Sequence, residues 1–277
     1  MNQTAINRAD ARTRFIFDDM PVRGLHVRLE NVWQHIVKQK NYPAAIRCAL
    51  GELLAAGVLL SGNLKNEGTL IVQVQGQGKL KMLVAEATSD RTVRATARWD
   101  ETAEIADDES LGDLLGGSIA QMLVNYMKRS EQLDTHIALS ASDEAAGGLL
   151  VQRLPEEVLD EEAWEHVSTL ARTLTAEELA ELDAQHVLYR LFHETPPRVF
   201  EPETFESSCT CSRGKVSDML LMLGGEEVGG VVAEQGSIEV DCDFCHSKYV
   251  FDETDVNALF GEDVVGVAKG LPRHTVQ

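Results

Sequence analysis

Cys209-Thr210-Cys211 and Cys242-Asp243-Phe244-Cys245 hold four of the five cysteines of this chain, and they decide how its C-terminal part folds. Thirty residues separate the two pairs. Two short cysteine pairs at the ends of a small lobe match a tetrahedral site in which four thiolates bind one Zn²⁺. The Cys-x-Cys spacing also brings two thiols within reach of a disulfide, and Cys-x-x-Cys is the spacing of redox-active pairs. The residues therefore favour a metal site and leave redox chemistry open.

The segment around these pairs is marginal as a self-supporting fold. We expect helices over 215–223 and 226–234, and short strands over 237–240 and 248–251. Gly229-Gly230 lies inside the second helix and weakens it by about 1 kcal/mol per glycine relative to alanine. A lobe of about 55 residues is marginal on its own core, whereas structural zinc contributes on the order of 10–16 kcal/mol of apparent binding free energy. Loss of the ion is therefore expected to unfold the lobe; a lobe stapled by zinc without any switching role is the simpler alternative.

The region before the lobe, from Pro155 to about Glu206, combines helical patterning with strong negative charge. It has fourteen acidic residues against three arginines. A capping box formed by Thr175 and Glu178 predicts a helix start, and Pro196-Pro197 ends the helical pattern. The residues expected on apolar helix faces are Trp164, Val167, Leu170, Leu174, Leu179, Leu182, Leu188, Leu191 and Phe192. The region is either a solvated helical linker or a metastable element, because like charges cost stability and its apolar faces need a neighbour.

The first 155 residues mix strands and helices in the manner of an α+β domain. A hairpin is predicted where Gly76-Gln77-Gly78 separates two apolar runs. Another strand pair is expected around the polar, Gly-rich turn 142–148, and 92–99 alternates as a half-buried strand does. The expected strands are 22–29, 70–75, 80–85, 92–99, 137–140 and 149–154, and the expected helices are 30–39, 43–60 and 111–129.

The charge of the whole chain narrows its possible functions. Its 277 residues include 45 Asp plus Glu and 25 Lys plus Arg, for a formal net charge of −20. Such a chain repels phosphate backbones, and with 5% aromatic residues it has few platforms for base stacking. We therefore expect neither nucleic acid nor membrane among its partners, which also disfavours a nucleic-acid-binding zinc ribbon.

The location of the protein follows from what the N-terminal and apolar segments lack. No signal peptide is recognisable, and the longest apolar run, near 53–60, is too short to span a bilayer. A cytoplasmic location is expected, and thiols are kept reduced there. Cys48 falls in the apolar helix predicted over 43–60, where a free cysteine packs as a small hydrophobe.

No motif for enzymatic catalysis is found. The sequence contains no GxxxxGK[ST], GxGxxG, HExxH or GxSxG, so we expect no enzyme. The alternative is a thiol–disulfide oxidoreductase that uses Cys242 and Cys245. Its usual motif lies at a helix start inside a βαβ unit, whereas this pair is predicted between two short strands. His246, directly after the second pair, is interpreted as a surface histidine, although it could replace a thiolate ligand during exchange.

These observations predict an α+β protein of several parts. We expect an N-terminal mixed α/β core domain over 1–155, an acidic helical linker over 156–204, a small C-terminal four-cysteine zinc lobe with a redox switch over 205–261, and a flexible tail over 262–277.

With these segments in view, the chain resembles the redox-regulated thirty-three-kilodalton heat-shock protein family, which are bacterial holdase chaperones. The combined Cys-x-Cys and Cys-x-x-Cys signature is highly specific at this separation, and the likeness covers nearly the whole chain. The segments that carry it are 60–65, 126–133, 147–155, 188–194, 209–213, 240–245 and 249–251.

The resemblance implies a redox-controlled chaperone. The reduced protein is expected to bind one Zn²⁺ through Cys209, Cys211, Cys242 and Cys245 and to be inactive. Hypochlorous acid, or peroxide with mild heat, would form the disulfides Cys209–Cys211 and Cys242–Cys245 and release zinc. The lobe and the adjacent linker would then lose order and expose apolar surface to unfolding client proteins. The resemblance further implies a homodimer that works without ATP and passes clients to an Hsp70-type foldase system.

Overall fold

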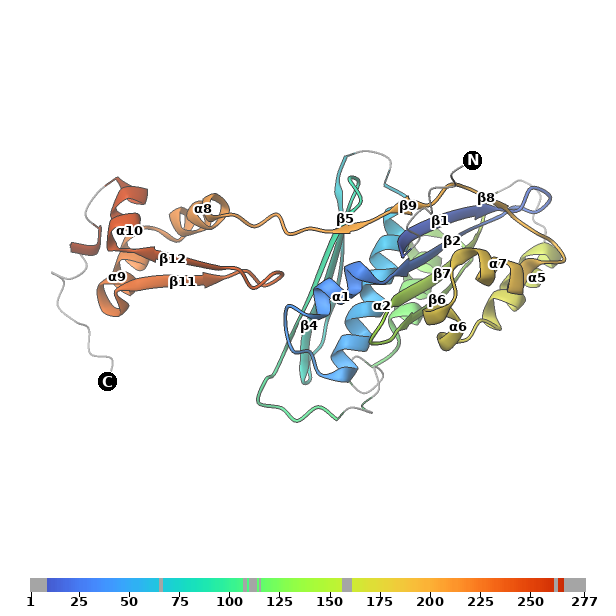
Figure 1. Ribbon diagram of the computed structural model, residues 1–277, viewed down its shortest axis with the longest axis horizontal. Helices are drawn as coiled ribbons and strands as arrows, with labels where there is room; N and C mark the ends of the chain where they lie inside the picture. The colour runs from blue at the N-terminus through green and yellow to red at the C-terminus, as the bar shows by residue number, and fades with distance from the viewer. Residues whose placement is uncertain are drawn as a thin grey trace, which may run out of the picture. The chain divides into compact units, whose positions relative to one another are not determined.

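The structure is a computed structural model that describes residues 9–64, 67–106, 109, 114, 116–155, 161–261 and 264–266 (Figure 1). The chain divides into two compact units, Met1–Ser208 and Cys209–Gln277. The first contains two sheets with helices between and beside them, and the second is a small helix-and-hairpin unit.

The first sheet of the N-terminal unit has the strand order β6-β7-β2-β1-β8, and every neighbouring pair in it is antiparallel. Its strands are β1 (Asp10–Ile16), β2 (Val22–Leu29), β6 (Thr135–Ala141), β7 (Ala146–Arg153) and β8 (Arg198–Val199). The pairing of β6 with β7 around the turn after Ala141 confirms the strand pair predicted there.

Strand β1 was not predicted, because its inward-facing residues include polar ones. Asp10 is buried and accepts hydrogen bonds from the backbone N–H groups of Glu30 and Val32 at 2.8 and 2.9 Å. Arg12 is also buried and pairs with Glu203. Buried polar groups of this kind are stable only when hydrogen-bonded, and their partners here come from distant parts of the chain.

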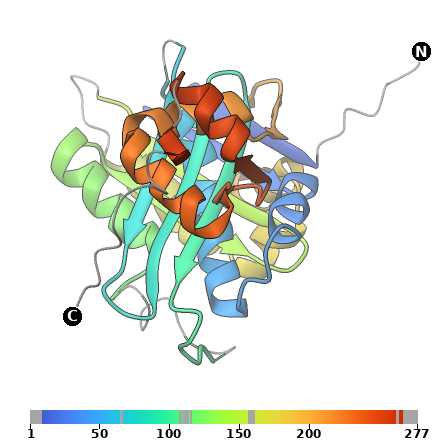
Figure 2. The ribbon, with the colours of Figure 1, turned by 90° about the vertical axis from the view of Figure 1, so that its left-hand side faces the viewer.

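The second sheet has the order β10-β5-β4-β3. Its strands are β3 (Thr69–Gln75), β4 (Leu80–Thr88), β5 (Thr92–Trp99) and β10 (Glu206–Ser207). Figure 2 shows the three long strands side by side. The β3–β4 pairing confirms the hairpin predicted at Gly76-Gln77-Gly78.

Helix α2 (Ala44–Ser61) is the centre of the first unit and contacts strands of both sheets (Figure 1). By length and composition it could span a membrane, which the prediction from the shorter run near 53–60 did not anticipate. Most of it is buried inside the protein, however, as is usual for the core helix of a soluble fold. The helix predicted over 30–39 is observed as the shorter α1 (Asn31–Val37). Of the helix predicted over 111–129, α4 (Ile119–Tyr126) begins after the N-cap Ser118 and continues as a π-helical turn, Met127–Glu131, whereas Gly116 and Gly117 lie outside it.

The acidic region forms helices that pack on the first sheet, so its described part is not a free-standing linker. The helices are α5 (Glu161–Arg172), α6 (Ala176–Glu181) and α7 (Ala184–Phe192). They cover the face of β7 that carries Leu149 and Val151, whereas Leu150 faces the core around α2. The apolar residues that these helices bury are Val167, Ala171, Leu179, Val187, Leu188, Leu191 and Phe192. The first sheet therefore covers the apolar faces of these helices. The predicted capping box of Thr175 and Glu178 at the start of α6 is confirmed.

The last segment of the first unit is paired with both sheets. β9 (Glu203–Thr204) pairs with β1, and β10 pairs with β5 in parallel. Phe205 between them is buried in the core around α2. Residues 205–208, which we expected in the zinc lobe, therefore pack with the first unit, and the second unit begins at Cys209.

The second unit is built from α8 (Arg213–Leu223), α9 (Gly225–Gln235), the hairpin β11 (Ser237–Asp241) and β12 (Lys248–Asp252), and α10 (Glu253–Phe260). Its core contains seven buried residues: Leu220, Val228, Val232, Phe251, Val256, Val264 and Val265. The last two lie within the tail that we expected to be flexible; the rest of that tail, apart from Gly266, lies outside the described residues. A Cβ atom on Gly229 would approach the carbonyl oxygen of Val264 to 2.8 Å, so close packing explains this helical glycine.

Candidate metal centre

The first cysteine pair lies just before α8, and the second pair lies in the connection between β11 and β12. Cys209 and Cys211 immediately precede α8, whose first turn is capped by the Ser212 side chain accepting from the Lys215 N–H. The other pair lies in the tight connection between β11 and β12. There the Cys242 N–H donates to the Ser247 carbonyl at 3.0 Å, and the His246 N–H donates to the Cys242 carbonyl at 2.8 Å. This hydrogen-bonded connection, residues 242–247, is called the knuckle below, and it carries both sulfurs of the second pair.

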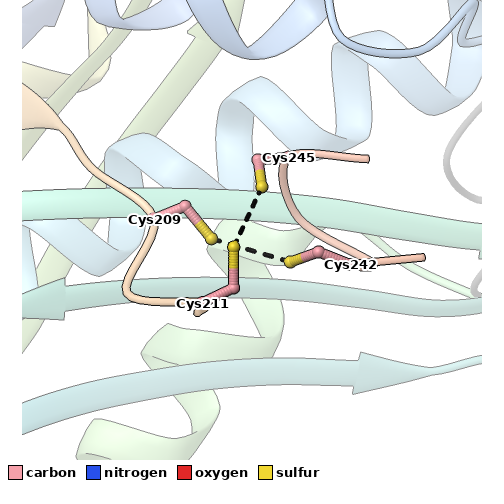
Figure 3. A group of neighbouring side chains, drawn as sticks. All are labelled: Cys209, Cys211, Cys242 and Cys245. Atoms are coloured by element: carbon pink, nitrogen blue, oxygen red, sulfur yellow. Dashed lines mark hydrogen bonds between the residues drawn. The ribbon is translucent and has the colours of Figure 1, made fainter. Parts of the chain in front are cut away.

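The four sulfurs form one cluster (Figure 3). All four Sγ atoms lie within 4.8 Å of one another. Cys209 Sγ is 3.6 Å from Cys242 Sγ, and Cys211 Sγ is 3.3 Å from Cys245 Sγ. A tetrahedral ion with metal–sulfur bonds of about 2.3 Å separates its ligands by about 3.8 Å. The donor set and its spacing therefore fit a four-thiolate metal site.

Hydrogen bonds make the four thiols unequal. Burial raises the pKa of Cys245, but hydrogen bonds with Ser247 and Cys211 outweigh it and lower that pKa to about 6. Burial raises the pKa of Cys209 and of Cys242. Cys245 therefore ionises first, and a thiolate is the form of cysteine that both binds metals and attacks oxidants.

Two hydroxyl groups contact the cluster, and sequence reasoning did not assign either of them a role at the metal site. The Tyr249 hydroxyl donates to Cys211 Sγ at 3.1 Å, and the Ser247 hydroxyl lies 3.2 Å from Cys245 Sγ. The hydrogen bond to Cys211 raises the pKa of Tyr249 to about 12. The available signals were position, because Ser247 and Tyr249 follow Cys245 by two and four residues, and, for Tyr249, its place in segment 249–251, which carries the family resemblance.

The start of α8 is fastened to the hairpin, which fixes the first pair against the second. Arg213 donates to the Val250 carbonyl at 2.7 Å and pairs with Asp255 at 2.7 Å. Its guanidinium also lies 4.1 Å from the centre of the Phe251 ring. A side chain two positions after Cys211 thus contacts β12 and α10.

The structure brings together all four cysteines that we predicted as metal ligands, and it places the other candidates elsewhere. Among the described residues, the cluster of ligand atoms contains the four sulfurs and not the His246 ring. Cys48 lies on α2 in the first unit, 3.6 Å from the Ala141 carbonyl, and burial raises its pKa. All five cysteines are free thiols.

The cluster does not decide which disulfides could form. Sulfur contacts of Cys209 with Cys242 and of Cys211 with Cys245 join the first pair to the second. Contacts across the two pairs are expected of any compact four-sulfur cluster. The neighbour pairing Cys209–Cys211 and Cys242–Cys245 remains a prediction.

The chain is similar to known proteins over nearly its whole length. A family model described as "Hsp33 protein" matches residues 10–116 and 109–252. A "33 kDa chaperonin" of Neisseria gonorrhoeae (strain NCCP11945) is 92% identical over all of both chains. One from Chromobacterium violaceum is 49% identical over 95% of this chain and 98% of its own.

A solved structure supports the fold. The crystal structure of a heat shock protein 33 homolog from Thermotoga maritima superposes on this chain with a TM-score of 0.80, and the two sequences are 24% identical. The match covers 91% of this chain and 98% of that chain.

Proposed function

This chain belongs to the Hsp33 family, and from that premise we propose that it is a redox-regulated chaperone that holds unfolding proteins. Its relatives are named 33 kDa chaperonins, which supports the chaperone activity itself. The observation that carries the regulation is the cluster of four sulfur atoms within 4.8 Å of one another. An N-terminal unit with none of the common catalytic motifs is consistent with a binding rather than an enzymatic role.

In the reduced protein, Cys209, Cys211, Cys242 and Cys245 would hold one Zn²⁺. The bound ion supplies a cross-link between the start of α8 and the β11–β12 knuckle. Four thiolates are a preferred donor set for zinc. The second unit has a core of seven buried residues in its described part, and a unit of this size is marginal without such a staple.

Oxidation would release the zinc ion, because it consumes the thiolates that bind the ion. Disulfides between Cys209 and Cys211 and between Cys242 and Cys245 convert four thiolates into poor donors. The second unit is then expected to lose its order.

The acidic helices α5–α7 are the element whose release would create a client-binding surface. They cover apolar residues of the first sheet, including Phe15, Val22 and Val151. The segment 155–206 carries fourteen acidic residues and three arginines, and this excess of like charge opposes its own packing. Exposed apolar surface of this kind is what binds the apolar segments of unfolding proteins.

We further propose a cytoplasmic homodimer that works without ATP and hands its clients to an Hsp70-type foldase system. A zinc site of four thiolates requires reduced cysteines, which suits a reducing compartment. The net charge of −20 argues against nucleic acid as a partner.

The deciding experiment measures aggregation of a heat-denatured client in the presence of reduced, zinc-loaded protein and of protein oxidised with peroxide at raised temperature. We expect suppression by the oxidised form alone, accompanied by the loss of one zinc and four thiols. A Cys48→Ser variant is the matched control and should behave as wild type. Equal suppression by both forms would refute the redox switch.

A thiol–disulfide oxidoreductase that uses Cys242 and Cys245 is the competing function, and the low pKa of Cys245 is the observation that favours it. Against it, the pair lies in a hairpin knuckle rather than at a helix start, and both of its sulfurs contact the other pair. Catalytic turnover of insulin disulfides by the metal-free protein would support the oxidoreductase.

A further inference from the structure

Tyr249 connects the two halves of the cysteine cluster. It lies on β12 opposite Val240 of β11, so it belongs to the hairpin that carries Cys242 and Cys245. Its hydroxyl nevertheless donates to the sulfur of Cys211, from the other pair, at 3.1 Å. The bond spans 38 positions of sequence, and it joins the strand leaving the knuckle to the segment entering α8.

The chemistry of this contact is directional. A tyrosine hydroxyl is protonated at neutral pH, and a thiolate has no proton to give, so the hydroxyl donates and the sulfur accepts. A donated hydrogen bond stabilises negative charge on the acceptor, and hydrogen bonds to charged groups are the stronger ones. A sulfur whose charge is stabilised in this way is a weaker nucleophile.

We propose that Tyr249 is a positioning residue of the thiolate cluster: its hydroxyl holds the Cys211 sulfur in place and makes that sulfur slower to react with peroxide. This inference rests on the proposed redox function, and it adds a residue that sets how readily peroxide oxidises the cluster. Groups that hydrogen-bond to metal ligands orient them and adjust their donor strength. Ser247 occupies the corresponding place beside Cys245.

The reaction that Tyr249 slows is a two-electron oxidation by a peroxide. The thiolate sulfur attacks one peroxide oxygen, the O–O bond breaks, and hydroxide leaves, which gives a sulfenic acid. A second cysteine then attacks the sulfenic sulfur, the S–S bond forms, and the hydroxyl leaves as water. Two thiols are oxidised to one disulfide, and one hydrogen peroxide is reduced to two waters.

The test compares the full-length, zinc-loaded wild type with Tyr249→Phe, which keeps the ring and removes the hydroxyl. Both are treated with excess hydrogen peroxide, zinc release is followed with a chromogenic chelator, and differential alkylation with mass spectrometry assigns thiol loss to each cysteine. We expect the Cys211 thiol to be lost about 3- to 10-fold faster in the variant, as a net hydrogen bond of ordinary strength implies. Tyr189→Phe is the matched control, because Tyr189 is 73% exposed on the first unit, and its rates should equal those of wild type.

Two further readouts separate a hydrogen bond from packing. In the cobalt-substituted protein, the thiolate-to-cobalt charge-transfer band should shift in Tyr249→Phe and stay unchanged in Tyr189→Phe. Ser247→Ala should instead accelerate the loss of the Cys245 thiol. The inference is overturned if Tyr249→Phe matches wild type while Tyr249→Leu is faster, since the ring alone would then matter. It is equally overturned if the initial rates of thiol loss, measured before zinc is released, rise equally at all four cysteines.

Failure of the proposed function would look different. In that case wild-type protein would bind no zinc, or would lose thiols without gaining chaperone activity. Alkylation of Cys211 by iodoacetamide then tests the hydrogen bond by itself, and it is followed over a pH series in the protein as purified, so that the rate constant of the thiolate is separated from the fraction of Cys211 that is ionised. We expect the thiolate rate constant to be higher in Tyr249→Phe than in wild type, and equal rate constants would overturn the inference.

Discussion

The guanidinium of Arg12 lies 2.7 Å from the carboxylate of Glu203, and this pair joins β9, near the end of the first unit, to β1. The same guanidinium donates to the Val58 carbonyl and to the Ser61 hydroxyl at the end of α2, each at 2.7 Å. It also lies 5.2 Å from the centre of the Phe205 ring. One buried arginine therefore links β1, α2 and the segment that leads to Cys209.

Removing Arg12 should loosen this segment. Arg12→Ala leaves the three-quarters buried Glu203 carboxylate without its nearer and buried partner, and breaking such a pair costs about 3 kcal/mol of unfolding free energy. Urea unfolding of the first unit measures the loss, and limited proteolysis after Pro197 should become faster. Arg14→Ala is the control: Arg14 is 53% exposed and 3.5 Å from Glu203, so its loss should cost under about 1 kcal/mol.

His26 should make the first unit less stable as the solution is acidified, whereas Glu52, whose pKa burial raises to about 7, should act in the opposite direction. Burial lowers the pKa of His26 from 6.5 to about 4, against an opposing effect of Asp183 and with a smaller contribution from Arg28. Because the folded pKa is depressed, the unfolded chain binds more protons between these values, and stability present above pH 6.5 is lost as pH falls towards 4. The loss is about 3 kcal/mol for a shift of this size.

Unfolding free energies measured between pH 7 and 4.5 test this expectation. Relative to wild type, His26→Gln should gain stability as pH falls from 7 to 4.5, whereas His166→Gln, at an exposed position of α5, should follow wild type. The pH dependence common to these proteins comes from His136, whose pKa burial also lowers, and from Glu52, whose pKa burial raises. A pH dependence identical in wild type and His26→Gln would contradict the assignment.

Two adjacent glycines of α9 should respond in opposite ways to alanine. A Cβ on Gly229 would meet the Val264 carbonyl oxygen at 2.8 Å, whereas a Cβ on Gly230 would meet nothing within 4 Å. Gly230→Ala should therefore stabilise the second unit by about 1 kcal/mol through helix propensity, and Gly229→Ala should destabilise it. The rate at which a chelator strips zinc from the full-length protein should fall in the first variant and rise in the second. Equal rates in both variants would show that the Val264 backbone moves away from the added Cβ atom at little cost in free energy.

Metal removal should unfold the second unit and spare the first. We expect hydrogen exchange at the buried core positions Leu220, Val232 and Phe251 to become fast after chelation, because seven buried residues make a small core. Exchange in α2, at the centre of the first unit, should stay slow. Continued protection of Phe251 without metal would show that the unit folds unaided.

Most of the strands and helices could be predicted because their residues follow a period. The alternation of Val93, Ala95 and Ala97 and the capping box at Thr175 are local signals, and both correspond to observed elements. Strand β1 could not be predicted, since Asp10 and Arg12 become acceptable inside the protein only through partners at Glu30 and Glu203. The burial of Val264 was missed for a similar reason, because it depends on how closely Gly229 lets the chain approach.

The sequence by itself determined the donor set, since two cysteine pairs at short, fixed spacing carry their chemistry wherever the chain places them. It also determined that the acidic region would be helical, because capping and periodicity act over a few residues. Only the tertiary structure decided that these helices cover the first sheet, and that Tyr249 and Ser247 contact the sulfurs. Those relationships depend on which distant surfaces meet, and the free energy of such contacts is set by packing in three dimensions rather than by any local pattern.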